Sequence, residues 1–234
     1  MRWAVLAFAM ALAGAASAQD RRDDPFRDPP RDGRQRPRYA NPSAVISADL
    51  MLSRRAREKG EGQALREAAA PRAAMFVPQR VEAGQWLKRG FAGAAATNWQ
   101  PHAVWMSCDG GIGVSRGTWR QGSTAGEYVA IWQRQENGEW RWLLREPVPA
   151  APLGEAPEMI AGKVAECTGL PARPRGFVPP PVDAAADASR DGSLEWAVRI
   201  EARCGRTVTV KAWNGRTMET VTEIRRPARA NDCG

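Results

Sequence analysis

The first candidate for acid–base chemistry in this sequence is a single histidine. His102 is the only histidine among 234 residues, and imidazole is the side chain whose ordinary pKa lies near neutrality. It could act as a general acid or base, or it could hydrogen-bond a ligand. The nearest carboxylates lie in or beside turns or near strand ends, where side chains are usually solvated: Asp109, Glu127, Glu136, Glu139 and Glu146. His102 is therefore expected either to contact a ligand or to be a hydrogen-bonded sheet histidine, and no catalytic residue is assigned.

Spacings typical of cofactor and metal sites are absent from the sequence. The segment GGIGVSRG at 110–117 is glycine-rich, but it joins two expected strands and lacks the G-x-G-x-x-G spacing of a dinucleotide site. One histidine and four distant cysteines do not form a zinc pattern. The sequence therefore predicts neither a cofactor nor a metal.

An alternation of apolar and polar residues begins at Gln100 and predicts four strands, at 100–108, 112–120, 127–135 and 139–147. The Asn137-Gly138 pair favours a two-residue hairpin turn, which places Gln133 opposite Trp142. In that register, each face of the hairpin is apolar away from the turn and polar close to it. Three tryptophans around the turn are thus predicted to be packing and rim residues rather than platforms that stack sugars or bases: Trp132, Trp140 and Trp142.

Helices are expected before these strands. Ser43 is a suitable N-cap for a helix that ends at Gly60. A second helix spans 63–70 and stops at Pro71. A short strand at 73–77, a third helix at 81–91 and a loop at 92–98 complete this part.

This order of elements resembles the SnoaL-like branch of the nuclear-transport-factor-2-like superfamily. The segments that carry the resemblance are AAMFVPQ, WQPHAVWMSCDG and IWQRQENGEWRW, and they fall within residues 43–147. Small exported bacterial members without a known activity are particularly similar. The resemblance implies an α+β fold in which a curved antiparallel sheet wraps around N-terminal helices into a cone with an internal cavity. Some members are enzymes, including ketosteroid isomerase, polyketide cyclases and scytalone dehydratase, whereas others bind ligands or only assemble.

The resemblance gives a cone domain at 42–148 and a set of residues that could line its cavity: His102, Trp105, Met106, Trp119 and Tyr128. Because the set lacks an assured base, the leading hypothesis is non-catalytic binding of a small apolar ligand, or scaffolding. The alternatives are a cofactor-free isomerase, cyclase or dehydratase, and a structural module that forms a homodimer through the open sheet face.

The N-terminal residues have the anatomy of a secretory signal. Arg2, an apolar run and the small residues Ala16-Ser17-Ala18 predict a signal peptide at 1–18, cleaved before Gln19. The protein is then expected in the periplasm or outside the cell, without membrane insertion after cleavage. Residues 19–41 are rich in Arg, Asp and Pro and should form a disordered linker. The formal charge of +8 comes from basic residues scattered among acids, which argues against nucleic-acid binding.

A second β-unit is expected after the cone. Residues 149–191 should form a connector with one strand at 159–167, followed by a β-meander at 192–226 and a tail at 227–234. The meander strands are placed at 194–201, 207–213 and 217–224, and a two-residue turn at Asn214-Gly215 brings residue 224 close to Gly205. The tail then starts beside Cys204, which predicts a Cys204–Cys233 disulfide and leaves Cys108 to pair with Cys167.

Overall fold

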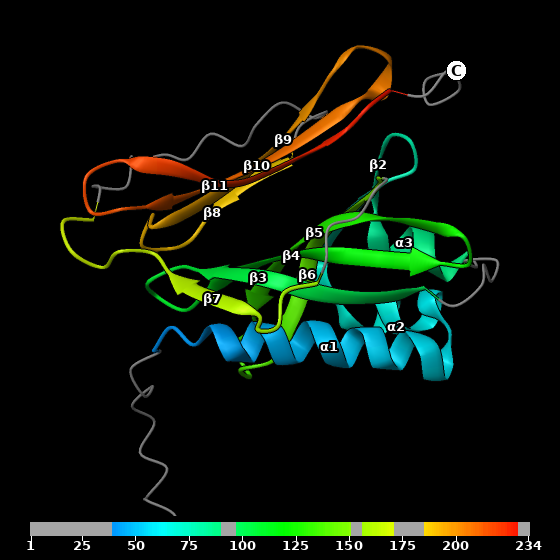
Figure 1. Cartoon of the computed structure of the whole chain (residues 1–234), viewed down its shortest axis with the longest axis horizontal. Helices are drawn as coiled ribbons and strands as arrows, with labels where there is room; N and C mark the ends of the chain where they lie inside the picture. The colour runs from blue at the N-terminus through cyan, green and yellow to red at the C-terminus, as the bar shows by residue number, and fades with distance from the viewer. Residues whose placement is uncertain (1–38, 90–96, 151–155, 171–184, 229–234) are drawn as a thin grey trace, which may run out of the picture. The chain divides into compact units, whose positions relative to one another are not determined.

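The computed structural model describes residues 39–89, 97–150, 156–170 and 185–228. These residues form an α+β structure with two separate sheets (Figure 1), which confirms the predicted class. The helices are α1 (Pro42–Lys59), α2 (Glu61–Ala68) and α3 (Ala83–Lys88). The strands are β1 (Ala69–Phe76), β2 (Arg80–Glu82), β3 (Asn98–Met106), β4 (Ile112–Gln121), β5 (Thr124–Arg134), β6 (Trp140–Pro149), β7 (Ala161–Val164), β8 (Ala185–Ala188), β9 (Leu194–Ile200), β10 (Arg206–Trp213) and β11 (Met218–Arg226).

The larger sheet has seven strands in the order β2-β1-β6-β5-β4-β3-β7, and the smaller has four in the order β11-β10-β9-β8. Strands β3 to β6 are the four predicted from the alternation, and they form a continuous antiparallel meander. Helix α1 runs along one face of this meander (Figure 1). Its buried residues are spaced three and four apart, so they form one stripe toward the sheet: Val45, Asp49, Leu52, Ser53 and Ala56.

The ends of α1 follow local chemistry, although the predicted cap was wrong. Asn41 is the N-cap, and its side-chain oxygen accepts a hydrogen bond from the amide of Ser43 at 3.1 Å. Pro42 fits the first helical position because an N–H at that position would have no acceptor within the helix, so its absence in proline loses no hydrogen bond. Gly60 ends the helix as predicted, with φ of 91°.

The second and third helices are shorter or displaced relative to the predictions. Helix α2 ends at Ala68, and β1 continues through Pro71, which was expected to be only a helix stop. The proline is tolerated because the β1–β6 register shifts between Ala69 and Ala74, so no regular ladder bond is lost there. Residues 81 and 82, expected to open the third helix, instead pair with β1 together with Arg80.

The tryptophan-rich hairpin has a three-residue loop, not the predicted two-residue turn. The amide of Gly138 donates to the carbonyl of Gln135, and Gly138 has φ of 88°, the arrangement of a turn followed by a glycine bulge. Near the loop, Trp132 therefore pairs with Trp142 rather than Gln133. A second irregularity restores the predicted pairing further along the strands. Both paired tryptophans are buried, while the loop tip is exposed, in agreement with their predicted packing role.

One irregularity interrupts the pairing of β3 with β4, and a glycine stands across from it. The pairing shifts between Pro101 and Ala103, which leaves His102 as the extra residue of a bulge. Across from it, Gly117 pairs with Pro101, and a Cβ at Gly117 would collide with the backbone carbonyl of Gln100. The close approach of the two backbones explains why glycine stands at this position.

The strand expected at 159–167 belongs to the larger sheet. Strand β7 pairs in parallel with β3 and forms the outer edge of the larger sheet. The smaller sheet gains β8 instead, a strand within the segment expected to be a connector.

The turn at Asn214 is also longer than predicted. The side chain of Asn214 accepts hydrogen bonds from the amides of Arg216 and Thr217, so the loop holds four residues and Trp213 pairs with Met218.

The C-terminal sheet covers the face of the larger sheet that points away from α1. On this face four large residues of β5 and β6 are buried: Val129, Ile131, Leu144 and Val148. They share one hydrophobic cluster with Trp196, Val198 and Val208 of the smaller sheet. The sheet face expected to be open for dimerisation is therefore occupied by the chain's own C-terminal strands.

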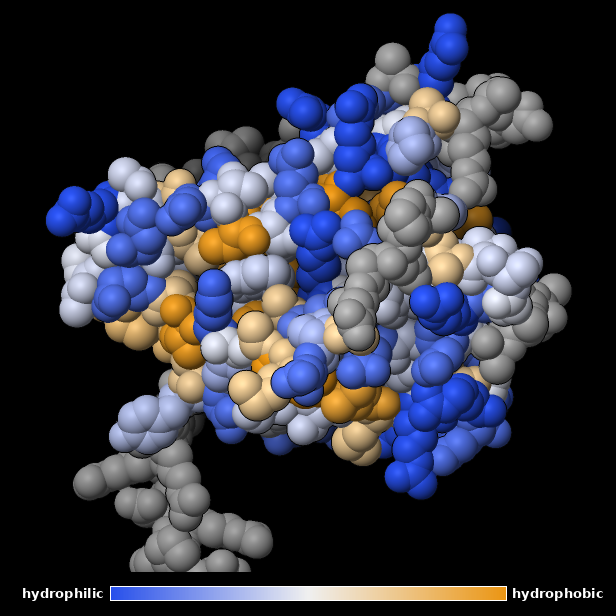
Figure 2. Space-filling model, in the orientation of Figure 1, coloured by the Kyte–Doolittle hydropathy of each residue, from blue (hydrophilic) through white to orange (hydrophobic). Residues whose placement is uncertain are grey.

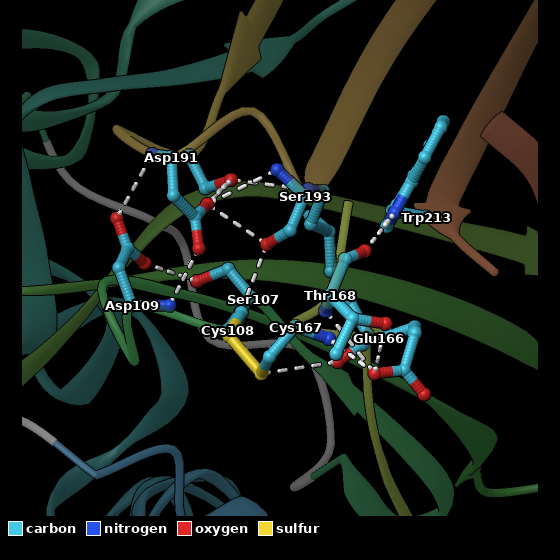
Figure 3. Close-up of a disulfide and its surroundings, with 12 residues drawn as sticks. Ser107, Cys108, Asp109, Glu166, Cys167, Thr168, Asp191, Ser193 and Trp213 are labelled. Atoms are coloured by element: carbon cyan, nitrogen blue, oxygen red, sulfur yellow. Dashed lines mark hydrogen bonds between the residues drawn. A yellow bond between two sulfur atoms is a disulfide. The ribbon is translucent and has the colours of Figure 1, made fainter. Parts of the chain in front are cut away.

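Two hairpin turns with the same sequence pattern meet where the sheets join (Figure 3). The β3–β4 turn, SCDGGI at 107–112, and the β8–β9 turn, SRDGSL at 189–194, share the pattern S-x-D-G-x followed by an aliphatic residue. In each turn, the first serine hydroxyl donates to the aspartate two residues later, at 2.6 Å. The two aspartates also form reciprocal hydrogen bonds. The Asp109 N–H donates to the Asp191 carboxylate at 2.7 Å, and the Asp191 N–H donates to the Asp109 carboxylate at 3.3 Å. The turns thus form a reciprocal pair that fixes one sheet against the other.

The reciprocal turns predict a specific acid sensitivity. Desolvation alone would raise the pKa of Asp191, but hydrogen bonds from Ser189, Ser193 and the Asp109 amide outweigh it, so the net pKa is lowered. A lowered folded pKa stabilises the protein above the ordinary carboxyl pKa, and this stabilisation is lost as pH falls through the folded value. Asp191→Ala should reduce the free energy of unfolding at pH 7 by about 1–2 kcal/mol, with a smaller difference from wild type at pH 2–3. Urea unfolding at several pH values tests this, and a difference that does not change with pH would contradict it.

One disulfide lies beside these turns. Cys108 and Cys167 are bonded, with 5.5 Å between their Cα atoms, which confirms the predicted pair (Figure 3). The bridge joins the end of β3 to the chain after β7, where the Glu166 amide donates to the carbonyl of Trp213 in the smaller sheet. The other predicted bridge, Cys204–Cys233, involves a residue outside the described part of the chain and stays a prediction.

Candidate functional site

A cavity of about 290 Å³ opens between the helices and the inner face of the larger sheet. Most of its wall is aromatic or aliphatic, from Leu65, Met75, Trp99, Trp119, Tyr128, Trp142, Pro147 and Pro149. Its polar lining residues are Glu61, Thr97, Gln121, Arg145 and Arg226. Apolar walls with a few polar groups, at a volume near the lower end of the usual range of roughly 300–1,000 Å³, are typical of small-molecule sites.

Behind the cavity wall lies a buried carboxylate. Asp49 of α1 has no solvent exposure. One of its oxygens accepts from the indole N–H of Trp99 at 2.9 Å, and the other accepts from the hydroxyls of Ser115 at 2.6 Å and Tyr128 at 2.8 Å. The Arg145 guanidinium lies 3.5 Å from the first oxygen. These four donors fill the acceptor sites of a carboxylate, so Asp49 holds the wall together and has no free lone pair for a ligand.

Tyr128 is fixed by this network. Burial raises its pKa well above the ordinary value, and the Asp49 charge adds to the effect. Its hydroxyl proton already bonds Asp49. The ring therefore serves as cavity wall rather than as a proton donor to a bound molecule.

Arg145 enters the cavity stacked on aromatic rings. Its guanidinium carbon lies 4.5 Å from the Trp99 ring centroid and 5.1 Å from that of Tyr128. Cation–π contacts of this length orient the planar group. The side chain is 12 % exposed, and the long contact to Asp49 leaves most of its five N–H donors available.

Two of the five predicted cavity residues line the cavity, Trp119 and Tyr128. Three do not. Met106 is buried beneath the start of α1, where its sulfur accepts the Asn41 N–H. Trp105 alternates with the buried Met106 and Val104, so it projects from the other face of the sheet.

His102 lies outside the cavity as well, because the bulge breaks the alternation on which its placement depended. Its Nε2 is 3.2 Å from the hydroxyl of Thr118. Thr118 shares a face with Arg116, which contacts Thr222 of the C-terminal sheet, so His102 points toward that sheet. Partial burial lowers the pKa of His102, and the nearby Glu127 charge opposes the shift. Of the two expectations for this histidine, the structure shows the hydrogen-bonded sheet residue.

The residues that the sequence reasoning missed are Asp49, Arg145 and Arg226. Asp49 did carry a signal, since it is an acid within the apolar stripe of α1. Arg145 occupies an inward position of β6, where a charge among apolar residues is unusual. Arg226 had no signal, because only the tertiary packing brings the end of β11 to the cavity.

Surface charge, helix hydropathy and the grouping of polar side chains were compared across the described residues. Figure 2 shows hydrophilic residues spread over most of the visible face, with smaller hydrophobic areas between them. Many basic side chains pair with acids, for example Arg54 with Glu58 and Arg225 with Glu201. Among the residues described, none of the helices is long and apolar enough to cross a membrane, and no group of three potential metal ligands comes together.

Comparisons with known proteins give matches among solved structures alone. A scan of the sequence against protein-family models finds no match, and neither does a search of curated proteins. Among solved structures, the chain is similar to a candidate ketosteroid isomerase from Parabacteroides distasonis, with 12% identity and a TM-score of 0.40 over 51% of this chain and 100% of that one. It is also similar to a nuclear transport factor 2-like protein from Salmonella enterica serovar Typhimurium, with 14% identity and a TM-score of 0.34 over 48% and 95%. Structural matches to this superfamily thus cover about half the chain.

Proposed function

We propose that the protein binds a small, largely apolar molecule in the cavity without transforming it. The observation that carries the proposal is the aromatic wall around about 290 Å³. Two walls, Trp99 and Tyr128, are fixed from behind by hydrogen bonds to Asp49. A wall with locked rotamers binds at a lower entropic cost than one that must become ordered around the ligand.

Binding is favoured over catalysis because neither Asp49 nor His102 can act as a base in the cavity. A general base must reach the reacting proton directly or through one water. Asp49 already has four donors, and His102 points to the opposite face. Neither group is placed to act on a molecule in the cavity.

A cofactor-free enzyme in the same cavity remains the second candidate, and Glu61 favours it. This carboxylate lines the cavity and accepts the Thr97 hydroxyl at 2.6 Å. If the cavity turns over a substrate, Glu61 is the base that it would use. Turnover that disappears in Glu61→Gln while binding persists would establish this alternative.

Binding is tested with a neutral two-ring probe, 1-naphthalenemethanol, by isothermal titration calorimetry. We expect saturable binding to the wild type that weakens about tenfold in Trp119→Ala, since an aromatic wall contributes roughly 0.5–1.5 kcal/mol beyond its buried area. Trp105→Ala is the matched control, because Trp105 lies on the other face of the same sheet, and its affinity should be unchanged. Failure of the wild type to bind the probe at millimolar concentration, or equal losses in both variants, would overturn the proposal.

The proposal includes export to an oxidising compartment. It is supported by the signal pattern of residues 1–18 and by the Cys108–Cys167 disulfide, since structural disulfides persist mainly outside the cytosol. Mass analysis of the protein from the periplasm should give Gln19 as the first residue. Recovery there with Met1 still attached would contradict the assignment.

A further inference from the structure

One cation of the cavity lacks an adequate partner. Arg226, at the end of β11, lines the cavity, yet its Nε is buried and has no hydrogen-bond acceptor among the described residues. Its remaining contacts are long, at 3.4 Å to the Pro147 carbonyl and 3.7 Å to the Glu146 carboxylate. Glu146 is already engaged by two hydrogen bonds from Arg206, at 2.8 and 3.1 Å. Two guanidinium groups thus share one carboxylate, which leaves a surplus positive charge and unpaired donors at Arg226.

Arg145 adds donors to the same cavity. Among the described residues, its one polar contact is the 3.5 Å approach to Asp49, whose oxygens also accept from three uncharged donors. The rings of Trp99 and Tyr128 hold its plane in place. A guanidinium with a fixed plane can present two parallel N–H groups, and this geometry matches a carboxylate.

The other polar groups of the cavity are engaged with one another. The Gln121 amide donates to the Thr97 hydroxyl at 2.8 Å, and that hydroxyl donates to Glu61 at 2.6 Å. These hydrogen-bonded residues lie next to β3 and β4. Arg145, by contrast, is on β6, and Arg226 lies beside Pro147 of β6. Glu61 is thus engaged by Thr97 rather than by either arginine.

We infer that the cavity selects a small apolar carboxylic acid, with the carboxylate held by Arg226 and Arg145 and the apolar body against the tryptophan wall. This inference rests on the proposed binding function and names its ligand class. Hydrogen bonds to a charged group contribute roughly 1.5–3 kcal/mol, or tenfold or more in affinity. The terminal nitrogens of Arg226, whose described contacts are long, gain a close charged acceptor when such a ligand is bound.

The test compares 1-naphthoate with 1-naphthalenemethanol, two probes that share the ring system and differ in charge. Calorimetry on the wild type should show naphthoate at least about tenfold tighter than the alcohol. In Arg226→Gln this preference should fall to within about twofold, because naphthoate loses more affinity than the alcohol does. Arg225→Gln is the matched control, because Arg225 is the adjacent residue and pairs with Glu201 away from the cavity; it should keep the full preference.

The outcomes separate the two proposals. Equal affinity for both probes in the wild type, or an equal loss of both in Arg226→Gln, would overturn the inference and leave the binding function intact. Failure of both probes to bind would overturn the binding function and the inference with it. Arg226→Lys serves as a second variant that keeps the charge but loses the planar fork, and it should retain part of the preference if the arginine contacts the carboxylate.

Discussion

Replacing Asp49 by alanine is expected to destabilise the protein by about 3–5 kcal/mol, the cost typical of removing one partner from a buried charged pair. The variant removes the acceptor for Trp99, Ser115 and Tyr128 and leaves Arg145 without its carboxylate. Each neutral donor left buried and unpaired adds its own desolvation cost. The free energy of unfolding is measured by urea titration.

Two control variants make this prediction specific to the network. Asp49→Asn keeps the size of the side chain and one carbonyl acceptor, so its loss should be intermediate. Asp187→Ala removes a carboxylate whose partner Arg72 is 73 % exposed, and exposed pairs contribute about 0–1 kcal/mol. If Asp49→Ala cost no more than Asp187→Ala, the network would not be what holds the cavity wall.

Regular elements of the fold could be predicted because their signals are local. Pro42 and Gly60 mark the ends of α1, and alternation marks β3 to β6. The predictions failed where an extra residue enters a strand or a loop. The bulge at His102, the glycine bulge at Gly138 and the side-chain-capped loop at Asn214 each shift the register by one or more residues. Strand β8, AADA, has no alternation to detect, and it is a strand because β9 pairs with it.

The candidate site was less predictable than the fold, for a related reason. Trp119 and Tyr128, two of the candidates given with the family resemblance, lie on regular stretches of strand and line the cavity. His102 was misplaced because a bulge moves it to the other face. Arg226 comes from a sheet outside the region of family resemblance, and sequence does not show which residue of that sheet reaches the cavity. Sites assembled from two sheets depend on packing that no single segment encodes.

At the buried ion pair that joins the two sheets, a single substitution should lower the free energy of unfolding, whereas a double substitution should restore it. Arg206 of β10 and Glu146 of β6 are each 2 % exposed and share two hydrogen bonds. Glu146→Leu alone leaves a buried guanidinium without this carboxylate and should cost about 3–5 kcal/mol. Glu146→Leu combined with Arg206→Met removes both charges and should return stability to within about 1 kcal/mol of wild type, or above it, because desolvation of a buried pair offsets most of its attraction.

The pKa of Glu146 gives this prediction a second readout. Burial raises it above the ordinary value, and the hydrogen bonds and charge of Arg206 lower it only in part. A raised folded pKa means that the folded state holds the proton more tightly, so this carboxyl's contribution to stability falls as pH rises through and above about 4.5. The double variant lacks that carboxyl, and its stability relative to wild type should therefore improve between pH 4 and pH 7. A double variant as unstable as Glu146→Leu, or a difference that moves the other way with pH, would show that the ion pair itself stabilises the contact between the sheets.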